Sequence, residues 1–134
     1  MKKLILSLSM LLSLTSCALY DAYVTAHFDN NEYKLINDIR TMSNQYASTC
    51  GKPEAQQAVN ELYNVSLQFK NYGEFIPHNE ETQKAAKELE EIVRDFRDRY
   101  RKPEPVSMFY CTTKFTTIER NAVKIQNIVG TKPR

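Results

Sequence analysis

The last third of the chain carries an apolar repeat that constrains the fold more than any other feature. Within 106–129, apolar side chains recur at steps of three and four: Met108, Cys111, Phe115, Ile118, Ala122, Ile125 and Val129. This spacing is typical of a helix that packs nearly parallel or antiparallel to its neighbours. We therefore expect a helix across 106–129 that buries this face and ends at Gly130.

Three further stretches show the same helical spacing. The first covers 19–49 and is interrupted by Asp29-Asn30-Asn31, where Asn31 is a candidate helix cap. The second covers 54–72, and the third covers 80–101. Their predicted buried residues are Phe28, Leu35, Ile39, Met42, Tyr46, Cys50, Ala55, Ala58, Val59, Leu62, Val65, Phe69, Tyr72, Ala85, Leu89, Ile92, Phe96 and Tyr100.

The connections between these stretches are short and contain helix-breaking residues. They lie at Gly51-Lys52-Pro53, at 73–79 and at Lys102-Pro103-Glu104-Pro105. Short connections place successive helices antiparallel and side by side. The whole chain has only 3 glycines and 5 prolines, too few turn-forming residues for a many-stranded sandwich or barrel. We expect an all-α, antiparallel up-down-up-down four-helix bundle.

The first seventeen residues have the pattern of an export signal. Met1-Lys2-Lys3 precedes about ten mostly apolar residues, which is too short for a bilayer span. The segment Leu14-Thr15-Ser16-Cys17 resembles the lipobox of bacterial lipoproteins. The resemblance implies that 1–16 is a removed signal peptide and that Cys17 carries a diacylglycerol on sulfur and a further acyl chain on its amine. Two or three acyl chains anchor a protein stably in a membrane.

The lipobox resemblance also implies a periplasmic location. By resemblance to enterobacterial lipoproteins, Ala18 after the lipidated cysteine directs the chain to the outer membrane, facing the periplasm. The alternative is an ordinary signal peptide, cut after a small residue, with a chance cysteine. We expect 17–30 to be a lipidated tether or helix extension, 31–130 the four-helix bundle, and 131–134 a tail.

Cys50 and Cys111 remain once Cys17 is assigned to lipid. A metal site lacks ligands, since no CxxC occurs and neither histidine lies within helical reach of a cysteine. A catalytic thiol would need a base, which the sequence does not specify. In an oxidising compartment a disulfide is the favoured alternative. An up-down-up-down bundle also brings the end of the first helix beside the start of the fourth, which agrees with this pairing.

Charge and motifs exclude several function classes. Removing Lys2 and Lys3 with the signal leaves 16 basic and 16 acidic side chains, so we expect no nucleic-acid partner. No nucleotide, hydrolase or metalloprotease motif occurs, and no histidine pairs with a second ligand at helical spacing. The acidic pairs Glu80-Glu81 and Glu90-Glu91 are expected on solvated faces. We therefore expect no catalytic residues, no metal, no cofactor and no enzyme activity.

One basic cluster stands out near the end of the third predicted helix. It contains Arg94, Arg97, Arg99, Arg101 and Lys102, together with two aspartates. Such a cluster is either a solvated helix end or a docking patch for an acidic partner or anionic headgroups. Eight tyrosines and no tryptophan also suit a protein interface. The predicted function is a membrane-anchored module that binds an envelope protein; the sequence leaves the oligomeric state open.

The layout resembles the small α-helical pilotins of type II secretion. The similarity consists of the lipobox cysteine, the segment Tyr-Ala-Ser-Thr-Cys-Gly at 46–51, and Pro105-Val106 shortly before Cys111. The chain lacks the family's Leu-Pro after the first of the two later cysteines and its tryptophan between them. The resemblance implies a helix-in-groove partner peptide. The alternative is a phage- or plasmid-encoded lipoprotein that blocks a receptor or acts in envelope disruption.

Overall fold

Four long helices make up most of residues 25–134, the part of the chain that the computed structural model describes. They are α2 (Asn30–Tyr46), α3 (Ala55–Gly73), α4 (Glu80–Tyr100) and α5 (Met108–Gly130), with a short 3-10 helix, η1 (Ala47–Thr49), after α2. Residues 25–134 contain no strand. The predicted all-α fold and its four helices are therefore confirmed.

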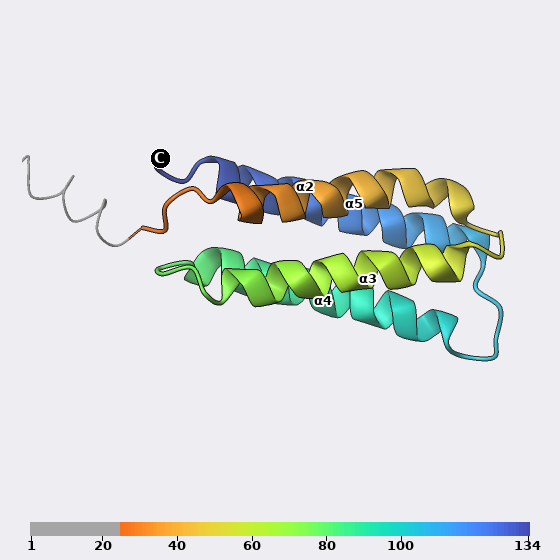
Figure 1. Ribbon diagram of the computed structural model, residues 1–134. Coiled ribbons are helices and arrows are strands. Elements are labelled where there is room, and N and C mark those ends of the chain that lie inside the picture. The colour runs from red at the N-terminus through yellow and green to blue at the C-terminus, as the bar shows by residue number, and fades with distance from the viewer. Residues whose placement is uncertain (1–24) are drawn as a thin grey trace, which may run out of the picture.

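The helices alternate in direction, as the short connections predict. Figure 1 shows the α2–α3 and α4–α5 connections at one end, and the α3–α4 connection together with the C-terminus at the other. Helix α2 packs against α3 and α5, and α4 packs against the same two helices. The arrangement is the antiparallel up-down-up-down bundle, in which each helix contacts two neighbours.

Helix α2 starts at the interruption predicted within 19–49, but with a different cap residue. The cap is Asp29, not Asn31: its carboxylate accepts hydrogen bonds from the backbone N–H groups of Asn31 and Glu32, each at 2.8 Å. An aspartate with extended backbone satisfies two N–H groups that the first helical turn leaves unpaired. Residues 25–29 are not helical, so α2 starts within the interruption that the sequence shows at Asp29-Asn30-Asn31.

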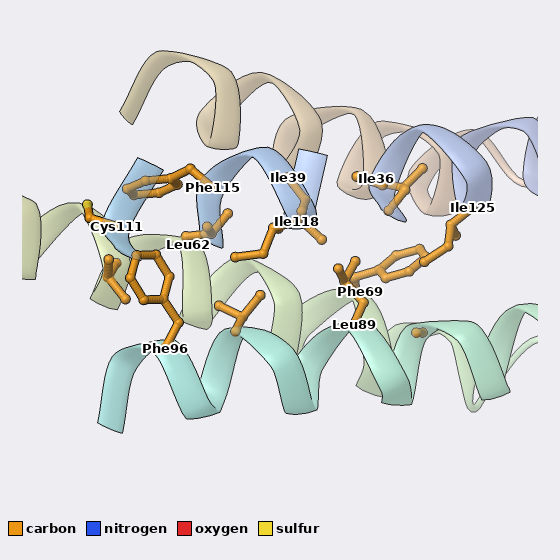
Figure 2. Packing of buried hydrophobic residues seen from close by; sticks show 14 of the residues in the cluster. Ile36, Ile39, Leu62, Phe69, Leu89, Phe96, Cys111, Phe115, Ile118 and Ile125 are labelled. Atoms are coloured by element: carbon orange, nitrogen blue, oxygen red, sulfur yellow. The ribbon is translucent and has the colours of Figure 1, made fainter. Parts of the chain in front are cut away.

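The core follows the predicted stripe of α5 most closely. Every stripe residue from Cys111 to Val129 is buried, whereas Met108, in the first turn, is exposed over 63% of its surface. Figure 2 shows Phe96 and Phe115 beside Cys111 at one end of this core. The two rings meet edge to face with centroids 5.1 Å apart, a favourable arrangement of aromatic quadrupoles.

The predicted buried faces of α3 and α4 are confirmed at Leu62, Phe69, Leu89 and Phe96, and they differ from the prediction at single positions. Val65 and Ile92 are only partly buried, and their neighbours Ser66 and Val93 are buried instead. Ser66 tolerates burial because its hydroxyl donates to the backbone oxygen of Tyr63 at 2.8 Å. Apolar spacing therefore identified the buried faces of both helices, apart from these neighbouring positions.

Candidate functional site

The bundle has two ends of different character. We call the end that carries 25–29, 74–79 and 131–134 the terminal end, and the end that carries 50–54 and 101–107 the disulfide end (Figure 1). Both ends expose a large apolar side chain: Phe75 at the terminal end, and Met108 and Phe109 at the disulfide end. These exposed side chains are the starting point for a functional assignment.

The disulfide end is cross-linked as predicted. Cys50 and Cys111 form a disulfide with their Cα atoms 5.7 Å apart, and both cysteines are buried. Gly51 follows with a φ of +80°, a left-handed conformation that turns the chain away from the bond. The bond joins the end of η1 to the first turn of α5, so it holds the exposed residues of that turn in place.

The structure gives three of the five predicted patch residues intramolecular partners. Arg94 pairs with Glu90 at 3.3 Å. The Arg97 guanidinium lies 3.7 Å from the centre of the Tyr63 ring and also pairs with Asp98. These contacts hold the two arginines along α4, with Arg97 largely covered. The expected solvation of Glu90 is wrong, because this carboxylate is 97% covered beside its arginine, whereas Glu91 is exposed as predicted.

Arg99 organises the connection between α4 and α5. Its guanidinium donates to the backbone oxygen of Glu104 at 2.9 Å and of Pro105 at 3.0 Å. This clamp orders a proline-containing connection that has no regular hydrogen bonding of its own. Ser107 then caps α5 by accepting the backbone N–H of Tyr110 at 3.1 Å.

Arg101 and Lys102 are the predicted patch residues that stay open to solvent. Both are exposed at the disulfide end, and Arg101 reaches only a distant contact with Asp98, at 3.7 Å. The structure therefore separates the predicted patch into a structural part and an open part. The open part lies at the same end of the bundle as Met108 and Phe109.

Phe109 is a candidate contact residue that the sequence reasoning missed. Its side chain is 81% exposed, in the first turn of α5. The signal was present in the sequence, because Phe109 falls outside the apolar stripe on which Cys111 and Phe115 lie. A large aromatic side chain off the buried face has no core position to fill.

The terminal end contains a buried polar cluster that the sequence did not indicate. Lys132 lies with its Nζ 2.5 Å from Oε2 of Glu32 and 2.5 Å from Oδ1 of Asn79. The Asn79 amide nitrogen donates to the other oxygen of Glu32, at 2.6 Å. All three side chains are buried or nearly so. Each charged group has partners for its hydrogen bonds, as burial of charge requires.

This cluster ties the predicted tail to the bundle. Lys132 belongs to 131–134, and the backbone oxygen of its neighbour Pro133 accepts the N–H of Phe28 at 2.7 Å. The guanidinium of Arg134 lies over the Phe28 ring, 5.2 Å from its centre. The two chain ends are therefore held together at the terminal end, beside the α3–α4 connection.

A hollow of about 380 Å³ opens on the terminal end; we call it the terminal hollow. It is lined by Thr25, His27, Phe28, Asp29, Tyr72, Phe75, Ile76, Pro77 and His78. The Tyr72 hydroxyl donates to the Asp29 carboxylate, at 3.1 Å from Oδ1, and so joins the two walls. His27 and His78 are both exposed.

Tyr46 and Glu61 form a hydrogen-bonded pair in which the pKa of each group is shifted. The Tyr46 hydroxyl donates to Oε2 of Glu61 at 2.5 Å. This hydrogen bond, supported by one from Gln57, lowers the pKa of Glu61. The same hydrogen bond, with burial and the adjacent negative charge, raises the pKa of Tyr46. The pair links α2 to α3 and has no nucleophile or second base beside it.

Residues 25–134 hold no group of three His, Cys, Asp or Glu side chains arranged to bind a metal ion. No helix in that range combines the length and apolarity of a membrane span. Cys17 and the signal sequence lie outside the described residues. Comparison with protein-family models, with curated proteins and with solved structures found no match to this chain.

Proposed function

We propose that this protein is a non-enzymatic lipoprotein that holds a binding surface at a membrane. Cys17 anchors it in the outer membrane, facing the periplasm, and the disulfide end binds a protein of the envelope. The observation that supports this proposal most directly is that the tether and the proposed binding residues lie at opposite ends of the bundle. The segment that would carry the lipid enters at the terminal end, and Met108, Phe109, Arg101 and Lys102 lie at the other end.

The lengths involved support this orientation. Thr25 lies eight positions after Cys17, and a fully extended chain of that length spans at most about 29 Å. Helix α4 has 21 residues, and at 1.5 Å per residue it is about 32 Å long. A lipid at Cys17 therefore keeps the terminal end near the bilayer, while the disulfide end extends into the periplasm by the length of the bundle.

The disulfide end suits a partner segment that is acidic and carries an apolar side chain. Phe109 and Met108 offer apolar contact area, and Arg101 and Lys102 add exposed positive charge, although Arg101 also lies 3.7 Å from the Asp98 carboxylate. Interfaces commonly combine an apolar centre with a charged rim, and aromatic, Met and Arg side chains are enriched in them. The rigid disulfide and the Arg99 clamp limit the ordering that binding would require.

The anchor is tested by fractionation of envelopes from cells that express the wild type or Cys17→Ala. We expect the wild type in the outer-membrane fraction, and the variant either unprocessed or released. An unchanged outer-membrane distribution of Cys17→Ala would refute the lipid anchor.

The binding surface is tested by cross-linking in detergent-solubilised envelopes. We expect a partner adduct with the wild type and with Phe75→Ser, and its loss with Phe109→Ser and with Arg101→Glu. Phe75 is a matched control, because it is an equally exposed phenylalanine at the opposite end. Retention of the adduct in both Phe109→Ser and Arg101→Glu would show that the partner binds elsewhere.

A further inference from the structure

We propose that the terminal end rests on the membrane and that Phe75 inserts its ring into the boundary between lipid headgroups and acyl chains. This inference rests on the proposed anchor at Cys17 and adds a second contact with the same bilayer. This contact would bury the exposed ring of Phe75 in lipid. It would also orient the long axis of the bundle away from the membrane surface, so that the protein does not rotate freely on its tether.

The exposure of Phe75 is the first observation behind this proposal. Its side chain is 86% exposed, more than any other large apolar residue in 25–134. It lies just after the end of α3, in a connection that continues with the partly buried Ile76 and with Pro77. Such a ring gains from transfer into an apolar medium, and aromatic side chains concentrate at the membrane interface.

The position of Phe75 relative to the anchor is the second observation. Phe75 and Thr25 line the same terminal hollow. Thr25 is the point at which the segment from Cys17 enters the described structure, and that segment reaches at most about 29 Å. A lipid-modified Cys17 therefore keeps Phe75 within reach of the bilayer surface at a high effective concentration.

The connection that carries Phe75 is held firmly against the bundle. Asn79, at its end, is fixed by Glu32 and Lys132 in the buried cluster. The side chain of Gln83 donates to the backbone oxygen of Gly73 at 3.1 Å, next to the start of the connection. The exposed ring is therefore presented from an anchored support, so that its insertion orients the whole bundle.

Charge at this end indicates which force drives the contact. Glu74 and Glu80 line one hollow together with Lys70, Lys84 and Lys87, so the surface near this end carries both signs. A surface of mixed charge has little attraction for anionic lipid. We therefore expect apolar insertion into zwitterionic lipid that is insensitive to salt.

The chain offers a clean spectroscopic test because it contains no tryptophan. The variants Phe75→Trp and Phe109→Trp each introduce one fluorophore at an exposed phenylalanine, at opposite ends of the bundle. The full lipidated proteins are reconstituted into vesicles of phosphatidylethanolamine and phosphatidylcholine, with or without brominated acyl chains. We expect blue-shifted emission and quenching by brominated lipid for Phe75→Trp, and neither effect for Phe109→Trp, at low and at high salt.

The outcomes separate this inference from the proposed anchor. If neither variant floats with the vesicles, the lipid anchor itself fails. If both float and Phe75→Trp is not quenched, the anchor stands and the insertion of Phe75 is refuted. Equal quenching of both variants would refute the upright orientation, and quenching that disappears at high salt would refute apolar insertion. Far-UV circular dichroism of both variants in detergent confirms that each retains its helices.

Discussion

Lys132 and Glu32, a hundred positions apart in the chain, form a buried ion pair at the terminal end of the bundle, with 2.5 Å between Nζ and Oε2. The lysine comes from the last residues of the chain, and the glutamate from the first turn of α2. Asn79 bridges them by donating to the glutamate and accepting from the lysine. A single cluster thus joins the start of α2, the start of α4 and the C-terminus.

Replacing Lys132 with methionine should destabilise the bundle strongly. The change leaves the Glu32 carboxylate buried without its cation, and breaking one partner of a buried pair costs about 3–5 kcal/mol. The free energy of unfolding is measured by urea denaturation followed by circular dichroism. The double variant Glu32→Gln/Lys132→Met should cost less than the sum of the single changes, because the uncompensated charge is gone.

Lys124→Met is the matched control for this experiment. Lys124 lies on the exposed face of α5, far from the buried cluster, so its replacement should change stability by less than about 0.5 kcal/mol. Equal effects of Lys132→Met and Lys124→Met would contradict a structural role for the ion pair.

Loss of the disulfide should lower stability without changing the fold. The bond closes a loop of 61 residues, and in the chain-entropy model such a closure stabilises the folded state by about 4 kcal/mol. The double variant Cys50→Ala/Cys111→Ala should therefore melt at a lower temperature than the oxidised wild type. Reductant should lower the melting temperature of the wild type and leave that of the variant unchanged; equal responses to reductant would contradict the prediction.

The hydrogen bond between Tyr46 and Glu61 should persist only within a window of pH. The pKa of Glu61 is lowered from its ordinary 4.5, so this contribution is present above pH 4.5 and is lost as the pH falls through the lowered value. The pKa of Tyr46 is raised above 10.0, so the contribution is present below pH 10.0 and is lost as the pH rises through the raised value.

The variant Tyr46→Phe removes the hydrogen bond and tests this assignment. The pKa of Glu61, followed by NMR titration of its carboxyl carbon, should move up toward 4.5 in this variant. Tyr33→Phe is the control, because Tyr33 makes no contact with Glu61. If the Glu61 titration is the same in the wild type and in Tyr46→Phe, the hydrogen bond does not form in solution.

Gly51→Ala should strain the turn that follows the disulfide. Gly51 has a φ of +80°, and an added Cβ would lie only 3.0 Å from the terminal methyl carbon of Met108. A left-handed backbone costs a non-glycine residue about 1–2 kcal/mol. Gly130→Ala is the comparison, since its φ is not positive and its Cβ would meet Tyr33 at 3.4 Å. A melting temperature lowered equally by both changes would contradict this account.

The fold was predictable because its pattern is local. Steps of three and four in 106–129 define one face of a helix, and short connections impose antiparallel neighbours. The pairing of Cys50 with Cys111 followed from the same topology together with the expected compartment. Each inference needed only the order of residues along the chain and the geometry of a helix.

The errors came from residues whose environment depends on distant partners. Lys132, in the predicted tail, is buried because Glu32 and Asn79 contact it from other segments of the chain. Only part of the predicted arginine patch stays open to solvent. The Arg97 guanidinium lies over the Tyr63 ring, and Arg99 donates a hydrogen bond to the backbone of the α4–α5 connection. From the sequence alone, a charged side chain is predicted to be exposed to solvent. It becomes buried where another segment of the chain supplies a partner for its charge.

The order of residues by itself determined the helices, their alternation and the cross-link, because helical periodicity and short connections act over a few neighbouring positions. The tertiary structure alone decided which charges are buried, where the C-terminus is held, and that the exposed Phe75 lies at the end of the bundle opposite to Phe109. Those features depend on which surfaces remain uncovered once four helices pack together, and contacts between residues up to a hundred positions apart set that outcome.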